Sequence, residues 1–499
     1  MKEMNSCPPN HSERICRAPS ASGVFIYIDN VARDKMITLW KANELPKNDP
    51  LSKSALPEGF PFLVVESDEG IEIQEHVLLY LHEKFARRKG RRSWKKNTAE
   101  AYAYDLRDWF AFLEVCENEI EENSKVGKAW DAATEDDYIN YREALQDAVS
   151  PHTRQYLSHS TIRRRQSTVE NFYKEAEKRD WYVGTFLKTS EFKKGRIRPA
   201  DRDAMVHLRA GRDTTRELSP YAEEVGETGV VHPLSTAEWR GVQRELGPLP
   251  SEPEENPRPS RDRLACELSL TTGIRVDEAA SLTVRHILKL NTDYLLLSEE
   301  DREYGYLKLY ITKTKRLKPR NVLVPCYLIP ELVRYIDGER TAAVLAGKAY
   351  STKHGKKYKE PDALFVNHAY PLQHAGNAIQ PASLSHAFRQ ACKAAGVMKT
   401  VQEIHVVEDD DGNETEVSVL RRAAAHCYHD LRHTFAVTMY FNEVDNRKPE
   451  PWLPIKELLG HASVETTRDI YLKVVTIEEK ARAGKVSYRA KQRVGGNHD

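Results

Sequence analysis

Residues 458–471 read LLGHASVETTRDIY and predict two consecutive helices with a sharp turn between them. Gly460 ends the first helix, because glycine adopts the left-handed conformation found at helix C-termini at little cost. Ser463 can cap the second helix, since its hydroxyl can accept a hydrogen bond from the first turn. That helix carries Tyr471. A single tyrosine is more often a half-buried packing residue than a nucleophile, so this stretch alone predicts local structure and no chemistry.

A second stretch, residues 429–433, reads HDLRH. On a helix His429 shares a face with Arg432 and with His433, because the spacings are three and four residues. Two histidines at this spacing also suggest a metal site. A metalloprotease would need Glu in place of Asp430, and the site would need a third ligand. We therefore expect no metal and no other cofactor.

Two basic residues stand in turns further upstream. Arg275 follows a Thr-Gly turn in TGIRVDE (residues 272–278), at a helix start, and its guanidinium suits bidentate contact with a phosphate. Lys313 lies in ITKTK (residues 311–315), at the turn of an expected hairpin, from which an ammonium can protonate a departing alkoxide. Each has an ordinary alternative: a surface arginine near a helix start, and a solvated basic turn.

The order of these residues is more specific than any one of them. An arginine after a Thr-Gly turn, a lysine in a hairpin, His-x-x-Arg, Gly-His and a tyrosine follow one another. This set resembles the tyrosine recombinase (phage integrase) family. The resemblance covers about residues 232–480 for the catalytic domain and about 75–186 for the helical core-binding domain that precedes it in that family. It implies a site-specific DNA recombinase or integrase with six catalytic residues: Arg275, Lys313, His429, Arg432, His461 and Tyr471.

The resemblance also implies a role for each of them. Tyr471 would attack the scissile phosphate and become a 3′-phosphotyrosine. Arg275 and Arg432 would clamp the non-bridging oxygens, and Lys313 would protonate the leaving 5′-oxygen. The choice of Lys313 over Lys315 rests on the Thr-Lys-Thr pattern of the family. The phosphotyrosine conserves the bond energy, so neither ATP nor a metal is implied.

Two histidines complete the implied site. His429 would act in proton transfer with Tyr471, and His461 would hydrogen-bond the phosphate. No other tyrosine competes well as the nucleophile, because Tyr428 precedes the arginine helix and Tyr440 has the wrong context.

The amino-acid composition limits the classes of protein to which the chain can belong. The 499-residue chain has 75 basic and 75 acidic residues, so its net charge does not point to nucleic acid. Seven widely spread cysteines without CxxC spacing argue against a disulfide framework and a zinc ribbon. The N-terminus lacks the apolar region of a secretory signal, and no apolar run approaches the roughly 18 residues of a membrane span. We expect a protein that works in the cytoplasm without a membrane partner.

Hydrophobic spacing divides the chain into domains. Apolar side chains at helical spacing in residues 75–188 predict a helical bundle, and residues 231–485 predict a second, mixed α/β region. The resemblance implies that the first is the core-binding, DNA-binding domain and the second the catalytic domain. The expected fold is mainly α with a small antiparallel β-sheet, in which residues 306–312 and 321–324 form a hairpin. We also expect an N-terminal extension of unknown role at residues 1–74, with possible strands at 23–28 and 60–65. A linker is expected at residues 189–230, surface insertions at 343–360 and 402–419, and a tail at 486–499.

Basic residues are concentrated in two stretches of the expected helical domain. Such clusters attract the DNA backbone through counterion release, whereas a solvated surface is the ordinary alternative. The residues expected to bind DNA are Arg91, Arg92, Lys95, Lys96, Arg163, Arg164 and Arg165.

The segment after Tyr471, residues 472–486, could form a short helix, and in the family such a tail often docks on a neighbouring protomer. The resemblance therefore implies a homo-oligomer, a tetramer on two double-stranded DNA sites. Two alternatives stay open. A type IB topoisomerase would relax supercoiled DNA as a monomer without sequence preference. A non-catalytic DNA-binding accessory protein would shift DNA in a gel without a covalent product.

Overall fold

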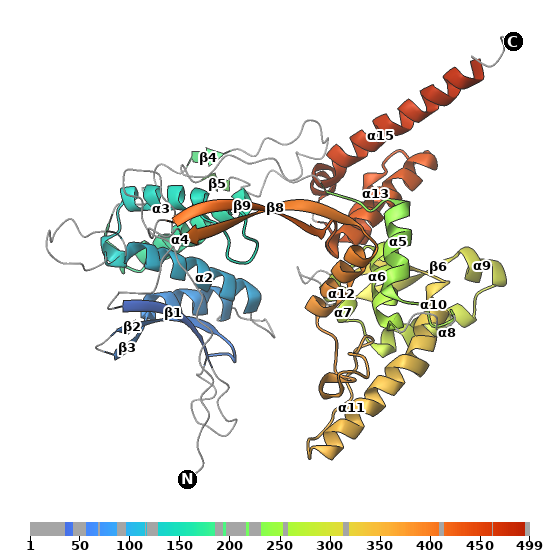
Figure 1. The fold of residues 1–499 in the computed structure, drawn as a ribbon, viewed down its shortest axis with the longest axis horizontal. Coiled ribbons are helices and arrows are strands. Elements are labelled where there is room, and N and C mark those ends of the chain that lie inside the picture. Colours follow the sequence, from blue (N-terminus) through green and yellow to red (C-terminus); the bar gives the residue numbers. More distant parts are fainter. Residues whose placement is uncertain are drawn as a thin grey trace, which may run out of the picture. The chain divides into compact units, whose positions relative to one another are not determined.

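The computed structural model describes residues 35–42, 56–67, 70–86, 96–114, 116, 128–184, 193–195, 216–218, 231–252, 258–312, 319–408, 414–461 and 463–494. The chain forms two compact units, Met1–Glu227 with Gln402–Val419, and Thr228–Val401 with Leu420–Asp499. Figure 1 shows the elements of both units. Among the described residues, no helix combines the length and apolarity needed to cross a membrane. The described cysteines are free thiols.

The first unit contains a three-stranded antiparallel sheet in the order β1-β2-β3 (Lys35–Lys41, Pro61–Ser67 and Gly70–Ile73). Leu63 and Val65 of β2 belong to the same hydrophobic core as Trp109 of the helical region. The expected strand at 60–65 is thus largely confirmed as β2, with β1 and β3 as its partners. The other expected strand, at 23–28, lies outside the described residues.

Four helices complete this core, and they confirm the expected helical region: α1, α2, α3 and α4 (Glu75–Leu81, Lys96–Leu113, Glu135–Asp147 and His159–Lys178). A π-helical turn (His82–Ala86) follows α1, and a 3-10 turn (Trp130–Ala132) precedes α3. Trp109 is fully buried, and its indole N–H donates to the Tyr173 hydroxyl at 3.1 Å. Thr134 and Ser158 cap α3 and α4 through their hydroxyls, as short polar side chains do at helix starts. Two short strands, β4 and β5 (Lys193–Gly195 and Arg216–Leu218), pair within the expected linker.

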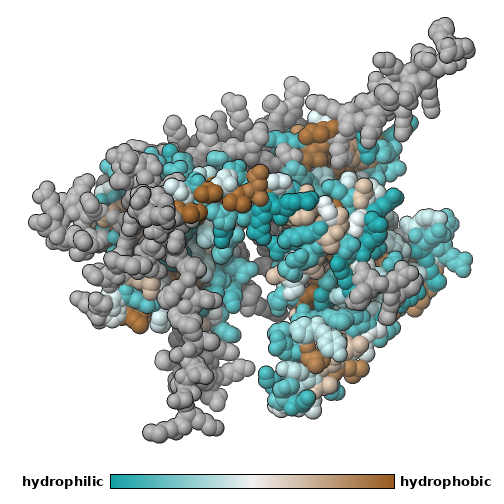
Figure 2. Space-filling view, in the orientation of Figure 1, coloured by the Kyte–Doolittle hydropathy of each residue, from teal (hydrophilic) through white to brown (hydrophobic). Residues whose placement is uncertain are grey.

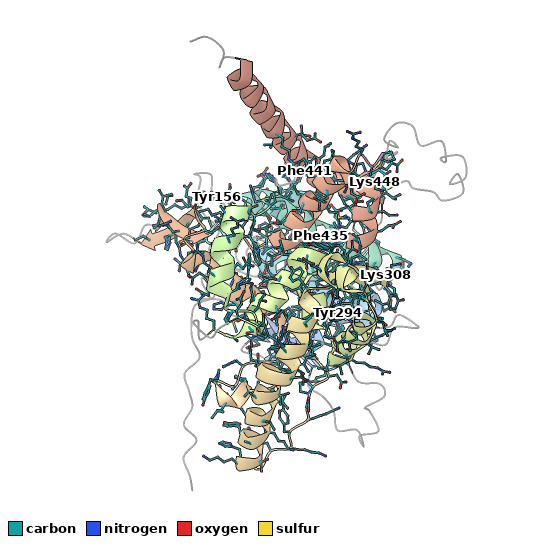
Figure 3. All side chains as sticks on the ribbon, turned by 90° about the vertical axis from the view of Figure 1, so that its right-hand side faces the viewer. Tyr156, Tyr294, Lys308, Phe435, Phe441 and Lys448 are labelled. Carbon is teal, nitrogen blue, oxygen red and sulfur yellow. The ribbon has the colours of Figure 1, made fainter. Side chains whose placement is uncertain are left out.

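A hairpin formed by β8 and β9 (Met398–Glu408 and Glu414–Ala424) contributes its outer part to the first unit. The Ile404 N–H donates to the Arg154 carbonyl at 2.7 Å, and the Tyr156 hydroxyl donates to Glu416 at 2.9 Å. Figure 3 labels Tyr156, and Figure 2 shows apolar side chains along the hairpin. Residues 402–419, expected as a surface insertion, are therefore hydrogen-bonded to a loop of the first unit that lies about 250 residues earlier in the chain.

The second unit is mainly helical and contains one two-stranded sheet, β6-β7 (Tyr306–Ile311 and Arg320–Pro325). Leu309 lies opposite Val322 in the antiparallel register, and both are buried, which confirms the expected hairpin. The helices before and around this sheet are α5, α6, α7, α8, α9 and α10 (Thr236–Leu246, Ser260–Thr272, Val276–Ala280, Val284–Leu295, Glu299–Tyr304 and Leu328–Tyr335).

The C-terminal helices of this unit carry three of the six expected catalytic residues, His429, Arg432 and Tyr471: α11, α12, α13, α14 and α15 (Thr341–Lys353, Pro381–Ala394, His429–Asp445, Trp452–Leu459 and Val464–Val494). Short π and 3-10 turns lie at Ile336–Arg340 and Leu372–His374. Helix α11 buries Ala343, Val344 and Gly347, so the first expected insertion is not wholly a surface feature. The expected helix at 472–486 is part of α15, whose C-terminal end extends away from α13 (Figure 1).

Candidate active site

Arg432 on α13 joins three motifs that are far apart in the sequence. Its side chain is 2% exposed. Its guanidinium donates to the Gly273 carbonyl at 2.5 Å and to the Leu459 carbonyl at 2.6 Å, and lies 3.3 Å from Nε2 of His461. Burial, followed by the positive charge of Arg275, lowers the pKa of Arg432 to about 9. These partners are uncharged or weakly basic, so the arrangement leaves a buried cation that favours an incoming anion.

Gly273 allows the Thr-Gly turn to lie close to α13 and α14. Its φ of +68° is in the left-handed region, which favours glycine. A Cβ atom there would lie 2.5 Å from Phe435, which Figure 3 labels, and 2.8 Å from Leu459. A side chain at position 273 would therefore push the Thr-Gly turn away from α13 and α14.

Arg275 lies at the N-terminus of α7, where Glu278 holds it. The Arg275 backbone N–H donates to Glu278 at 2.9 Å, and its guanidinium lies 3.3 Å from the other carboxylate oxygen. Glu278 also accepts two hydrogen bonds from Arg320 of β7, at 2.8 and 2.7 Å. Burial would raise the pKa of Glu278, but the hydrogen bonds from Arg320 and Arg275 hold it below its usual value. The Arg275 side chain is 24% exposed, so part of it can reach a ligand.

The same Arg320 supports the Gly-His turn after α14. Its Nε donates to the Leu458 carbonyl at 2.7 Å. A Cβ atom on Gly460 would lie 2.9 Å from Arg320 Cδ, and the φ of Gly460 is +69°. Gly460 thus ends α14 as expected, and the Glu278–Arg320 ion pair links the Arg275 turn to the His461 turn. This pair was not among the expected site residues, although Glu278 stands in the quoted TGIRVDE motif.

Tyr471 lies on α15 with its side chain only 1% exposed. Its hydroxyl lies 3.1 Å from Nδ1 of His433, and its ring stacks on His461 with a 12° angle between the planes. Burial raises the pKa of Tyr471 to about 12, against the opposing charges of Arg432 and Arg275. The hydroxyl therefore keeps its proton at neutral pH and needs a base before it can attack.

The two expected catalytic histidines differ in what they contact. His461 contacts Thr467 through Nδ1 at 2.9 Å and Arg432 through Nε2, so both ring nitrogens are held. His429 is exposed at the start of α13, and its ring packs edge-on against His433 with centroids 4.7 Å apart.

The structure therefore brings five of the six expected catalytic residues into one unit, while Lys313 lies outside the described residues. In the basic stretches, Arg91, Arg92 and Lys95 also lie outside them, and Lys96 begins α2. Arg163 on α4 is exposed, whereas Arg164 forms an ion pair with Asp105, and Arg165 pairs with Asp108 at 2.8 Å. No group of three or more His, Cys, Asp or Glu side chains placed to hold a metal occurs in the described part of the chain.

His433 was considered in the sequence only as a metal ligand, yet it is the residue that contacts the Tyr471 hydroxyl. The sequence feature that could have pointed to His433 as a site residue was its spacing of four residues from His429. Burial, together with the nearby His429, lowers the pKa of His433 to about 4.

This low pKa predicts a pH dependence of stability. The unfolded chain, with a histidine pKa near its usual value of about 6.5, binds the proton before the folded protein does. The free energy of unfolding should therefore fall as the pH drops from about 6.5 toward about 4, by up to about 3 kcal/mol from this group. His433→Asn should flatten this dependence in urea denaturation at several pH values. An unchanged slope would show that another group titrates.

Two family models match the chain. The model described as phage integrase, N-terminal SAM-like domain, matches residues 88–180, and the phage integrase family model matches residues 243–476. A comparison with curated proteins finds no match. Solved structures with similarity include the XerH site-specific recombinase bound to palindromic difH substrate (16% identity, 78% of this chain and 79% of that chain, TM-score 0.43). Another is a lambda integrase (75–356) dimer bound to a COC' core site (14% identity, 80% and 94%, TM-score 0.41). With both domains matched by models of one family, the chain belongs to the phage integrase family.

Proposed function

We propose that this chain is a site-specific DNA recombinase or integrase that cuts and rejoins DNA strands through a 3′-phosphotyrosine intermediate. The observation that carries the proposal is the buried guanidinium of Arg432, close enough to Tyr471 for each to shift the pKa of the other. Among the described residues, its hydrogen-bond partners are two carbonyl oxygens and an imidazole, with no carboxylate. A DNA phosphate would supply the missing anion within reach of the tyrosine. Membership of the phage integrase family supports the same reaction.

In the proposed reaction three requirements are met by separate residues. Tyr471 attacks the scissile phosphate, and Arg275 and Arg432 neutralise its non-bridging oxygens. Lys313, assigned from the resemblance alone, protonates the 5′-oxygen as it leaves. His461, assigned from the resemblance, hydrogen-bonds the phosphate, for which its Nε2 would exchange the contact with Arg432 for a phosphate oxygen. The tyrosyl phosphodiester retains the bond energy, so rejoining needs no ATP.

A suicide DNA substrate, nicked beside the target site so that the cleaved end is lost, tests this proposal. A recombinase should accumulate a protein–DNA adduct that survives denaturation, and mapping the junction on DNA gives the cleavage site. Relaxation of any plasmid by monomer at low concentration would favour the topoisomerase alternative. A gel shift without an adduct would favour the accessory protein.

We further propose that the working form is a homo-tetramer on two double-stranded DNA sites, acting in the cytoplasm. The support is α15, which continues from Tyr471 to Val494 and gives the tail a helix that can dock on a neighbouring protomer. Light scattering with and without DNA should show the larger assembly on DNA.

The basic stretches predict a salt effect on binding. Arg163 is exposed on α4, so we expect this member of the cluster to contact a DNA phosphate. Arg163→Ala should reduce the slope of log affinity against log salt by about 0.9, the value for one lost phosphate contact on duplex DNA. Lys178→Ala, an exposed residue at the end of the same helix, is the matched control and should leave the slope unchanged. Equal slopes for both variants would show that the cluster is an ordinary solvated surface.

A further inference from the structure

His433 lies between Tyr471 and the histidine of the His-x-x-Arg motif. Its Nδ1 is 3.1 Å from the Tyr471 hydroxyl oxygen, with ring centroids 5.5 Å apart. On its other side the ring of His429, one helical turn earlier, packs edge-on at 4.7 Å. Tyr471 comes from α15 and both histidines come from α13, so tertiary packing brings the three rings together.

The hydroxyl of Tyr471 must lose its proton as it attacks. At neutral pH the hydroxyl is protonated, as a tyrosine with its usual pKa also is, and burial makes the proton harder to remove by raising the pKa to about 12. A general base has to lie within hydrogen-bond reach of that proton, roughly 2.6–3.2 Å between heavy atoms. Nδ1 of His433 meets this distance. His433 is also neutral in the folded protein, so in the tautomer with its proton on Nε2 the Nδ1 lone pair is available.

We propose that His433 is a further catalytic residue, the group that accepts the hydroxyl proton of Tyr471 during cleavage and returns it during rejoining. The inference rests on the proposed function. As the bond from the Tyr471 oxygen to phosphorus forms, the bond from phosphorus to the 5′-oxygen breaks, and its electron pair stays on that oxygen. The proposed acid Lys313 protonates the leaving oxygen, while the tyrosine proton moves to Nδ1 of His433. Rejoining reverses each transfer, so the steps balance without any co-reactant.

The charged groups around His433 allow its ring to hold a proton for part of the reaction. From α13 it faces His429, Asp430 and Arg432, and from α15 it faces Tyr471. The positive Arg432, and a charge on the His429 ring, would disfavour the imidazolium, whereas Asp430 favours it. A bound phosphodiester would add a further negative charge, so the imidazolium becomes more favourable only on DNA. His429, which the resemblance places in proton transfer with Tyr471, would then act through His433.

The test compares cleavage rates on two suicide substrates, one with the normal 5′-oxygen and one with sulfur at that bridging position. A thiolate leaves without protonation, so the sulfur substrate removes the need for an acid but not for a base. His433→Asn retains a polar atom near the position of Nδ1 but cannot take up the proton. We expect it to cleave about 100-fold more slowly than wild type on both substrates, within the range for general base catalysis. Lys313→Ala should be slow only on the oxygen substrate. His386→Asn, an exposed histidine on α12, is the matched control and should cleave normally.

Two more measurements keep the inference testable if Asn disturbs the fold. Added imidazole should restore part of the cleavage by His433→Ala, and the restored rate should rise with pH through the pKa of free imidazole. Three results would overturn the inference. The first is cleavage by His433→Asn within threefold of the wild-type rate, and the second is rescue of that variant by the sulfur substrate. The third is a cleavage rate of His433→Ala that does not change when imidazole is added. Failure of the wild-type protein to form any adduct would instead overturn the proposed function.

Discussion

Tyr471→Phe is expected to bind target DNA like the wild-type protein and to form no covalent adduct on a suicide substrate. Phenylalanine keeps the buried ring and its stacking on His461, so the fold of α15 should be retained. The variant loses the hydrogen bond to His433, which costs about 1 kcal/mol in a typical case. The oxygen that would bond to phosphorus is absent, so the loss of adduct should be complete. Denaturing gels and a parallel gel-shift titration measure the two effects.

Tyr440→Phe provides the matched control. Tyr440 lies on α13 of the same unit, and its hydroxyl donates to Glu479 at 2.9 Å, away from the residues around Arg432. This variant should form the adduct at the wild-type rate. An adduct that persists in Tyr471→Phe would show that another residue is the nucleophile, and peptide mapping of that adduct would identify it.

The second large effect is expected for Glu278→Gln. Glu278 is 1% exposed and receives the Arg320 guanidinium, which is itself only 7% exposed. Removing the negative charge leaves Arg320 buried without its counter-ion, and breaking such a pair typically costs about 3–5 kcal/mol. The free energy of unfolding, measured by urea denaturation, should fall by about this amount. Cleavage should fall as well, because Glu278 positions Arg275 and Arg320 supports the turn that carries His461.

Asp277→Asn is the control for this change. Asp277 precedes Glu278 in the first turn of α7 and is exposed, so its loss should cost no more than about 1 kcal/mol through the helix dipole. The variant Glu278→Gln with Arg320→Gln should recover part of the loss, since no buried charge is then left unpaired. Equal stabilities for Glu278→Gln and Asp277→Asn would show that the ion pair does not hold the site together.

Much of the local structure was predictable from short stretches. Ser235 and Glu238 form a capping box at the start of α5, and Ser463 accepts the Thr466 N–H at 3.1 Å as the expected cap of α15. Gly460 ends α14 in the left-handed conformation. These features depend on backbone preferences and on contacts within four residues, which a sequence states directly.

Contacts between distant segments were harder to predict from the sequence. Nothing in the basic stretch at 163–165 indicates that Arg164 and Arg165 find Asp105 and Asp108 on a neighbouring helix. The acidic and apolar residues of 402–419 likewise did not indicate hydrogen bonding to residues 154–156. Pairings of this kind depend on how helices pack, and many alternative partners are compatible with the same local pattern.

The sequence by itself determined the helices, the β6-β7 hairpin, and, through the order of its motifs, the family and the residues of the expected site. Only the tertiary structure decided which atoms those residues contact. Arg432 meets Gly273, 159 residues away, and His433 rather than His429 contacts the Tyr471 hydroxyl. The physical reason is that spacing along a helix gives the face on which a side chain lies, whereas its partner depends on which helix packs against that face. For Tyr471, that packing supplies both the proposed base and the cation beside it.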